Sequence, residues 1–156
     1  MSFVDEWMRS ACESAEVEPA PFDREKSMEI VDKAVRKHGL RRTYGDIVKR
    51  LHASVSFQHP NAWQAVGDYP HDGWVFCFSD AEYGRSVYAF DSLNVLSKVL
   101  GKCPASFYWY VVDPDFTFLL AEDRDDYFVG SGAATEWVQK AGEASGSTVL
   151  IRVYGV

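Results

Sequence analysis

The sequence predicts an α+β fold, in which N-terminal helices pack on a largely antiparallel sheet of about five or six strands. Apolar residues recur at helical spacing over the first 52 positions, whereas short apolar runs separated by polar turns dominate from residue 74 onward. A length of 156 residues suits one domain. Because residues 1–52 alone would form too small a core, we treat residues 1–156 as a single α+β domain.

Two amphipathic helices are predicted at the N-terminus. The first covers about residues 2–15 and the second about residues 23–38, with Asp23 as N-cap and Gly39 as the left-handed residue that ends it. Their apolar faces are expected to comprise Phe3, Val4, Trp7, Met8, Ala11, Cys12 and Ala15 in the first helix, and Met28, Val31, Ala34 and Val35 in the second.

The middle of the chain is less regular. A shorter helix is predicted over about residues 43–51, capped by Thr43. Residues 52–73 have no clean apolar period and contain two prolines, so we expect an ordered loop region with a short turn of helix near Trp63.

From Trp74 onward, the pattern predicts strands joined by tight turns. The first two strands should form a hairpin, and two short helices are expected at about residues 92–100 and 133–141. The expected strands cover residues 74–78, 87–90, 107–112, 116–121, 127–129 and 148–154.

Charge is distributed unevenly along the chain. The net charge of −7 divides into −4 for residues 1–21, +4 for residues 22–52 and −7 for residues 53–156. An acidic body repels a phosphate backbone and suits a basic partner, so nucleic acid is not the expected general partner.

The sequence also indicates where the protein works. It contains no apolar run of about 18 residues, and its first residues lack the basic and apolar regions of a secretory signal. The three cysteines, Cys12, Cys77 and Cys103, are odd in number and widely spaced, which suits reduced thiols. We therefore expect a cytoplasmic protein that does not contact the membrane.

We find no motif that supports catalysis, a metal or a cofactor. None of the four histidines is spaced to share a metal with another ligand, and HExxH, CxxC and phosphate-binding glycine motifs are absent. The Gly130–Gly132 segment places Val129 where a nucleophile elbow requires glycine. Cys103 has no obvious base nearby in the sequence. The expectation is a protein that is not an enzyme and that needs no metal or cofactor.

The acidic turn at residues 122–126 is the most informative candidate site. Glu122, Asp123, Asp125 and Asp126 surround Arg124, and a second acidic turn containing Asp113 should lie at the opposite end of the intervening strand. Acidic residues are common in turns because aspartate suits turn geometry, but this group could also meet a basic protein. We assign the partner-binding surface to Asp123, Arg124, Asp125 and Asp126, together with Tyr83.

A resemblance gives this surface a context. The segments 107–113 and 118–127, ending in Gly130-Ser131-Gly132, combine an aromatic strand, an aliphatic strand and an acidic turn. This pattern covers about a third of the chain and resembles small bacterial α+β immunity proteins of polymorphic toxin systems. The resemblance implies a cytoplasmic protein that binds and neutralises a cognate toxin, and it carries over no active-site residues.

Two alternatives stay open at this point. One is a small-ligand-binding or enzymatic domain, with a pocket near residues 53–73 and with His59, Tyr69 and His71 as its polar groups. The other is a nucleic-acid adapter that uses the basic residues of segment 33–50.

Overall fold

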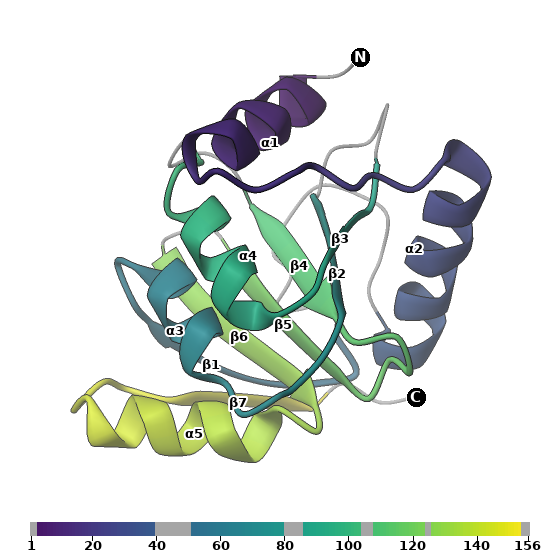
Figure 1. Ribbon diagram of the computed structural model, residues 1–156. Coiled ribbons are helices and arrows are strands. Elements are labelled where there is room, and N and C mark those ends of the chain that lie inside the picture. The colour runs from purple at the N-terminus through teal and green to yellow at the C-terminus, as the bar shows by residue number, and fades with distance from the viewer. Residues whose placement is uncertain (1–2, 40–50, 80–85, 104–107, 124–125, 154–156) are drawn as a thin grey trace.

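The computed structural model describes residues 3–39, 51–79, 86–103, 108–123 and 126–153. Seven strands form one antiparallel sheet in the order β3-β2-β4-β5-β6-β1-β7 (Figure 1). The strands are β1 (Ala53–Gln58), β2 (Val75–Ser79), β3 (Tyr88–Phe90), β4 (Trp109–Val112), β5 (Phe118–Asp123), β6 (Tyr127–Gly132) and β7 (Leu150–Val153). The helices are α1 (Phe3–Ser14), α2 (Arg24–His38), α3 (Ala62–Asp68), α4 (Leu93–Leu100) and α5 (Thr135–Ala144). The predicted α+β class is confirmed, with more strands than expected.

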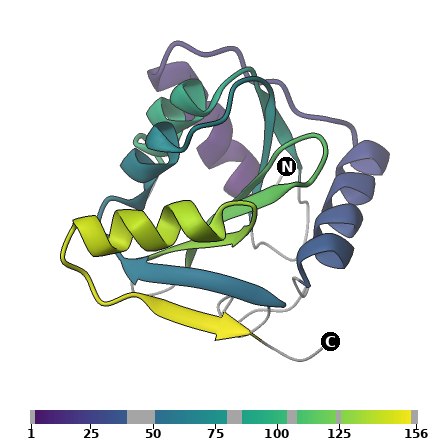
Figure 2. The same cartoon turned by 90° about the horizontal axis from the view of Figure 1, so that it is seen from below.

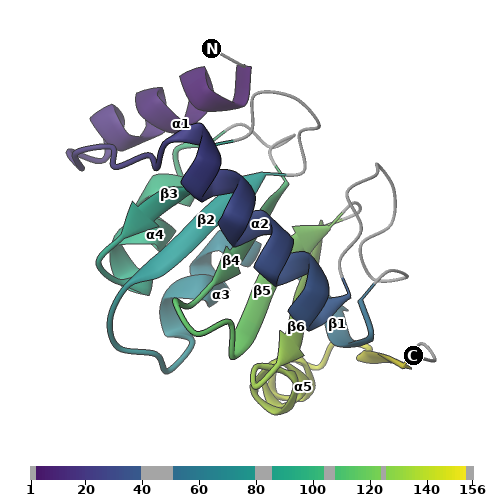
Figure 3. The ribbon, with the colours of Figure 1, turned by 90° about the vertical axis from the view of Figure 1, so that its right-hand side faces the viewer.

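Helices cover both faces of the sheet and give the domain two apolar cores. Helices α1, α3, α4 and α5 pack on one face, and α2 runs diagonally across the other (Figures 2 and 3). Strand β4 shows why both faces are apolar, because Trp109 and Val111 enter the four-helix core while Tyr110 and Val112 enter the α2 core. Successive side chains of a strand point to opposite faces, so a central strand is apolar throughout.

Helix α2 has the predicted ends but a different buried face. The Asp23 carboxylate accepts a hydrogen bond from the Lys26 backbone N–H at 2.8 Å, and Gly39 ends the helix with φ of 75°. Met28 was expected to be buried and is 49% exposed. The helix is rotated relative to the expected orientation, so that Ser27 is buried in place of Met28. The buried residues are Ser27, Ile30, Val31, Ala34 and His38.

The expectation of a loop over residues 52–73 was wrong for its first part. Residues 53–58 form β1, a central strand between β6 and β7, with Val55 opposite Gly130 on one side and Ile151 on the other. Val55 and Phe57 point into the four-helix core, while Ser54 and Ser56 are buried on the α2 face. The two serines obscure the apolar pattern that normally marks a central strand. The expected helical turn near Trp63 is present as α3.

The two edges of the sheet differ. The outer edge of β3 is covered by the segment after α1, where Phe22 N–H donates to Val87 O at 2.8 Å and Ala89 N–H donates to Ala20 O at 3.0 Å. Strand β7 forms the other edge, and its residues Ile151 and Val153 are exposed. Covering an edge in this way satisfies backbone groups that would otherwise be open to pairing with another chain.

The remaining elements agree with the sequence, apart from shifts of a few residues at their ends. β2 and β3 form the predicted hairpin, β4 and β5 are neighbours, and Ser92 caps α4. The helix predicted over residues 43–51 falls almost entirely outside the described residues. None of the described helices is long and apolar enough to cross a membrane.

Candidate functional site

The acidic turn lies at one end of the central strands. β5 ends at Asp123 and β6 begins at Tyr127, and these two residues are paired in the sheet. Asp126 is exposed and has φ of 62°, and its backbone carbonyl accepts a hydrogen bond from the His59 N–H at 2.7 Å. Arg124, Asp125 and Tyr83 lie outside the described residues. Asp126 is therefore the predicted contact residue on which the site is built below.

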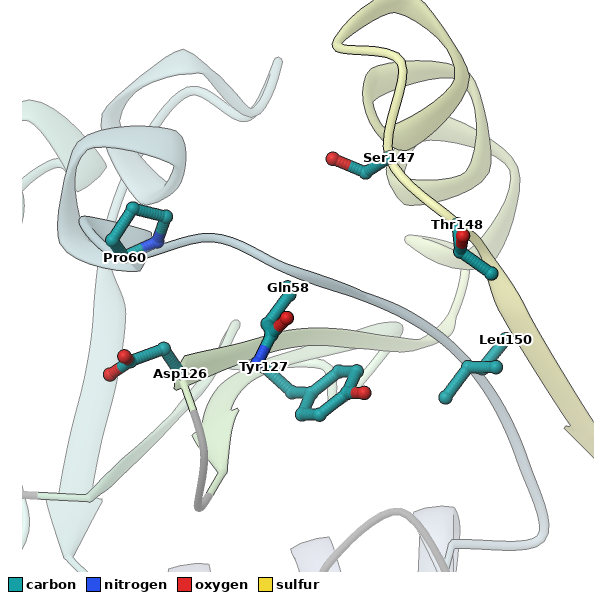
Figure 4. A pocket seen from close by; sticks show the side chains of 7 residues that line it. All are labelled: Gln58, Pro60, Asp126, Tyr127, Ser147, Thr148 and Leu150. Carbon is teal, nitrogen blue, oxygen red and sulfur yellow. The ribbon is translucent and has the colours of Figure 1, made fainter.

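A hollow of about 450 Å³ opens beside Asp126 (Figure 4). It lies where β1 ends, β6 begins and the chain enters β7. Its polar lining groups are the Asp126 carboxylate, the Gln58 amide, and the hydroxyls of Tyr127, Ser147 and Thr148. Apolar surface comes from Pro60, Leu150 and the Tyr127 ring. The described residues that line it are Gln58, Pro60, Asp126, Tyr127, Ser147, Thr148 and Leu150.

Glu122 belongs to the same end of the sheet but faces the four-helix core. It is opposite Phe128 in the β5–β6 pair, and that phenylalanine is fully buried. Burial raises the pKa of the Glu122 carboxyl to about 7, and the charge of Asp126 adds to this, whereas a hydrogen bond from Trp109 acts in the opposite direction. Glu122 is thus a half-buried carboxyl that takes up a proton near neutral pH.

The second acidic turn has a structural role. Asp113 is buried, and its carboxylate accepts hydrogen bonds from the Thr117 N–H and hydroxyl at 2.7 Å each and from the Phe118 N–H at 3.1 Å. These bonds hold the β4–β5 turn. The predicted placement of the two turns at opposite ends of β5 is confirmed, since β5 runs from Phe118 to Asp123 between them.

An apolar groove of about 540 Å³ lies on the α2 face near the start of that helix. Trp74 lines this groove and is 54% exposed, although the sequence analysis placed it inside a buried strand. Phe22 and Phe76, which also line the groove, form an edge-to-face pair with ring centroids 5.2 Å apart. The groove is lined by Ala20, Pro21, Phe22, Trp74, Phe76, Ala89 and Pro114.

Acidic residues predominate among the sequence neighbours of the residues that line this groove. Within two residues of its lining positions the described chain has one exposed base, Arg24, and several exposed acids. These exposed acids are Glu18, Asp23, Asp72, Asp91 and Asp115. Asp113, also within two residues of the lining, is buried in its turn. An apolar patch of this kind with a polar rim is typical of a protein-interaction surface.

The histidines proposed for a pocket near residues 53–73 do not share one site. His71 and Tyr69 pack against Phe118, with ring centroids 5.0 and 4.8 Å from it, at the end of β5 that follows the Asp113 turn. His59 lies at the opposite end of β5, beside Asp126. Part of that segment does line a hollow, through Gln58 and Pro60.

His38 is the last residue of α2. Its side chain is buried, and its Nε2 lies 3.1 Å from the Phe116 carbonyl. Burial lowers the pKa of His38, with smaller opposing contributions from that hydrogen bond and from Asp113. Because a carbonyl oxygen can only accept, Nε2 donates its proton in this hydrogen bond, and we assign His38 a structural role.

The nucleophile candidates are engaged in packing and hydrogen bonding. The Ser131 hydroxyl is buried and donates to the Ala53 carbonyl at 2.7 Å, which ties β6 to β1. Cys12 and Cys77 are fully buried, as expected for small core residues, and burial raises the pKa of both thiols. Cys103 is half-buried, and burial raises the pKa of its thiol to about 12. Such thiols are poor nucleophiles.

Comparison with protein-family models, with curated proteins and with solved structures gives no match to this chain.

Sequence reasoning missed the Trp74 groove and most of the Asp126 hollow. Trp74 begins an apolar run, and the turn signal just before it, Asp72-Gly73, is the feature that could have indicated a position at the mouth of the strand. Gln58 and Thr148 come together only because β1 pairs with β7, and no local pattern predicts such a distant pairing.

Proposed function

We propose that this protein is a binding protein rather than an enzyme, and specifically an immunity protein that binds and neutralises a basic toxin domain. The observation that supports this most directly is the apolar groove that contains the exposed Trp74, whose lining residues have several exposed acids as sequence neighbours. Exposed tryptophans are rare on surfaces that meet only water, and they are enriched among residues that dominate binding energy.

The groove suits a partner that combines an apolar anchor with flanking basic residues. Covering the exposed part of the Trp74 ring and the edges of Phe22 and Phe76 would remove apolar surface from water, which favours association. The acids around the groove would attract the basic residues and accelerate the encounter, as would the net charge of −7. This combination matches the neutralisation of a cationic toxin that acts on an anionic substrate.

The direct test examines the genes that flank this one and uses any toxin domain that they encode; their encoding none would count against the immunity function. The toxin is co-expressed in a sensitive bacterium with the wild-type protein or with Trp74→Ala, and the dissociation constant is measured with purified proteins. We expect Trp74→Ala to abolish protection and to weaken binding by at least about 30-fold, the effect of losing a contact of about 2 kcal/mol.

Met28→Ala is the matched control, because Met28 is 49% exposed and does not line the groove. We expect it to bind and protect like the wild type. Equal protection by Trp74→Ala, with unchanged affinity, would refute the groove as the toxin-binding site. If the wild-type protein neither binds the neighbouring toxin nor protects against it, the immunity function itself is wrong.

The acidic turn is a second predicted contact. Reversal of Asp125 and Asp126 to lysine is expected to leave the fold intact and to slow association with the toxin, and the loss should shrink at high salt because screening weakens electrostatic steering. Association rates at two ionic strengths test this. An unchanged rate at low salt would show that the turn does not contribute to binding.

A further inference from the structure

The hollow beside Asp126 has the features of a built binding site, independent of the Trp74 groove. Its volume of about 450 Å³ lies within the range of small-molecule pockets. Three separate parts of the chain form it: the end of β1, the start of β6 and the segment leading into β7 (Figure 4). The sheet fixes their relative positions, because Gln58 is paired with Tyr127 and Leu150 is paired with Ser56.

The lining groups define the kind of ligand. Among the lining residues that the structure describes, Asp126 is the one acidic side chain and none is basic. The hydroxyl oxygens of Tyr127 and Thr148 can each accept a hydrogen bond, as can that of Ser147, which already lies 2.9 Å from the Ser145 hydroxyl.

Apolar surface accompanies these acceptors. Pro60, Leu150 and the Tyr127 ring line the same hollow and can pack against an alkyl chain, and the ring face also attracts a cation. The ligand class that meets all of these features is a positively charged donor group at the end of an aliphatic chain.

The Asp126 carboxylate is available to such a ligand. No described residue forms an ion pair or a side-chain hydrogen bond with it. The nearest histidine, His59, is engaged elsewhere: its Nδ1 accepts a hydrogen bond from the Asn61 N–H at 3.0 Å, and its ring lies 6.0 Å from that of Phe57. Arg152 is on the same face of β7 as Leu150 but does not line the hollow.

We propose that this hollow binds a guanidinium or ammonium group carried on a short alkyl chain, with Asp126 as its counter-ion. The same chemistry occurs in an arginine or lysine side chain of a bound protein and in a free small amine. A charge-assisted hydrogen bond to the carboxylate supplies the largest contribution, and the acceptors around it fix the orientation of the group.

The isolated protein is sufficient to test the site. Backbone amide signals of Tyr127, Thr148 and Leu150 are followed by NMR during titration with n-butylguanidinium chloride and with n-butylammonium chloride at constant ionic strength. Sodium acetate serves as the anionic control. We expect saturable shifts with the cations and no saturable shift at these amides with acetate.

The variant pair is Asp126→Asn and Asp68→Asn. Asparagine tolerates the left-handed backbone that Asp126 adopts, so the first variant removes the charge without straining the turn. Asp68 is an exposed acid at the end of α3 that does not line the hollow. We expect Asp126→Asn to weaken binding of the better cation about tenfold or more, and Asp68→Asn to leave it unchanged.

Three results would overturn the proposal: no saturable shift with either cation, equal affinity in both variants, or saturable binding of acetate at the same amides. Once binding is found, the affinity of Asp126→Asn for the toxin domain identifies the source of the cation. A loss of affinity indicates a side chain of the toxin, and unchanged affinity indicates a free amine. The probe titrations need no partner, so their result does not depend on the immunity function.

Discussion

Replacing Glu122 with glutamine should stabilise the protein at neutral and alkaline pH. Glutamine keeps an oxygen that can accept the hydrogen bond from the Trp109 indole, and it removes a charge that burial disfavours. The pKa of this carboxyl is about 7 in the folded protein, against an ordinary value of 4.5. Between these two values the folded state holds more protons than the unfolded state, so wild-type stability falls as the pH rises from about 4.5 to 7.

The size of the effect follows from that difference. Converted in full, the shift corresponds to about 3 kcal/mol in the free energy of unfolding. Glu122 is only half-buried, so solvent screening reduces the expected contribution to about 1–2 kcal/mol. Glu122→Gln should therefore gain this amount over the wild type between pH 5 and pH 8.

Urea unfolding of both proteins at pH 5 and pH 8 measures the gain. Contributions from other titrating groups, including His38, are the same in both proteins and cancel in the comparison. Glu136→Gln provides the control, because Glu136 is exposed and paired with Lys140 at 2.9 Å, which lowers the pKa of Glu136. That variant should gain nothing at pH 8. A stability difference between Glu122→Gln and wild type that is the same at both pH values would refute the reasoning.

Three further perturbations test the packing and the expected absence of a metal. Gly142→Ala places a Cβ 2.7 Å from a Val149 methyl and 2.8 Å from the Phe57 ring. Although alanine has the higher helix propensity, the free energy of urea unfolding should fall by about 1–3 kcal/mol. A rise would contradict the packing. Tyr88→Phe removes the hydroxyl that donates to the buried Asp5 carboxylate at 2.7 Å. The free energy of unfolding should fall by about 1–3 kcal/mol. No change would mean that water replaces this donor. EDTA should leave the thermal midpoint unchanged, because the described residues contain no group of three metal ligands; a drop of several degrees would reveal a site.

The fold class was predictable because local patterns determine most elements. Asp23 and Gly39 specify the two ends of α2 through chemistry that acts within a few residues. The aromatic run around Trp109 and the aliphatic run around Leu120 are apolar on both faces, which suits central strands regardless of their neighbours. Such signals need no knowledge of distant contacts.

Strand β1 and the depth of His38 could not be predicted in this way. Ser54 and Ser56 are polar, and their hydroxyls have no hydrogen-bond partner among the described residues, so only the surrounding sheet makes this segment a buried strand. His38 could equally have been an exposed cation at a helix end. Its burial depends on where the β4–β5 turn places the Phe116 carbonyl. The hollow beside Asp126 likewise depends on distant contacts. The local sequence indicated Asp126, but it did not indicate the other residues that line the hollow.

During synthesis, β1 is made before both of the strands that pair with it. Val55 lies opposite residues 130 and 151, so β1 leaves the ribosome long before either of its partner strands exists. Until then Phe57 has neither Phe128 beside it nor α5 above it, and an apolar, unpaired strand is a target for chaperones and for other nascent chains. The high sequence separation of these pairings also slows folding. The β1 segment can therefore complete its pairing in the sheet only after the β7 segment has been made.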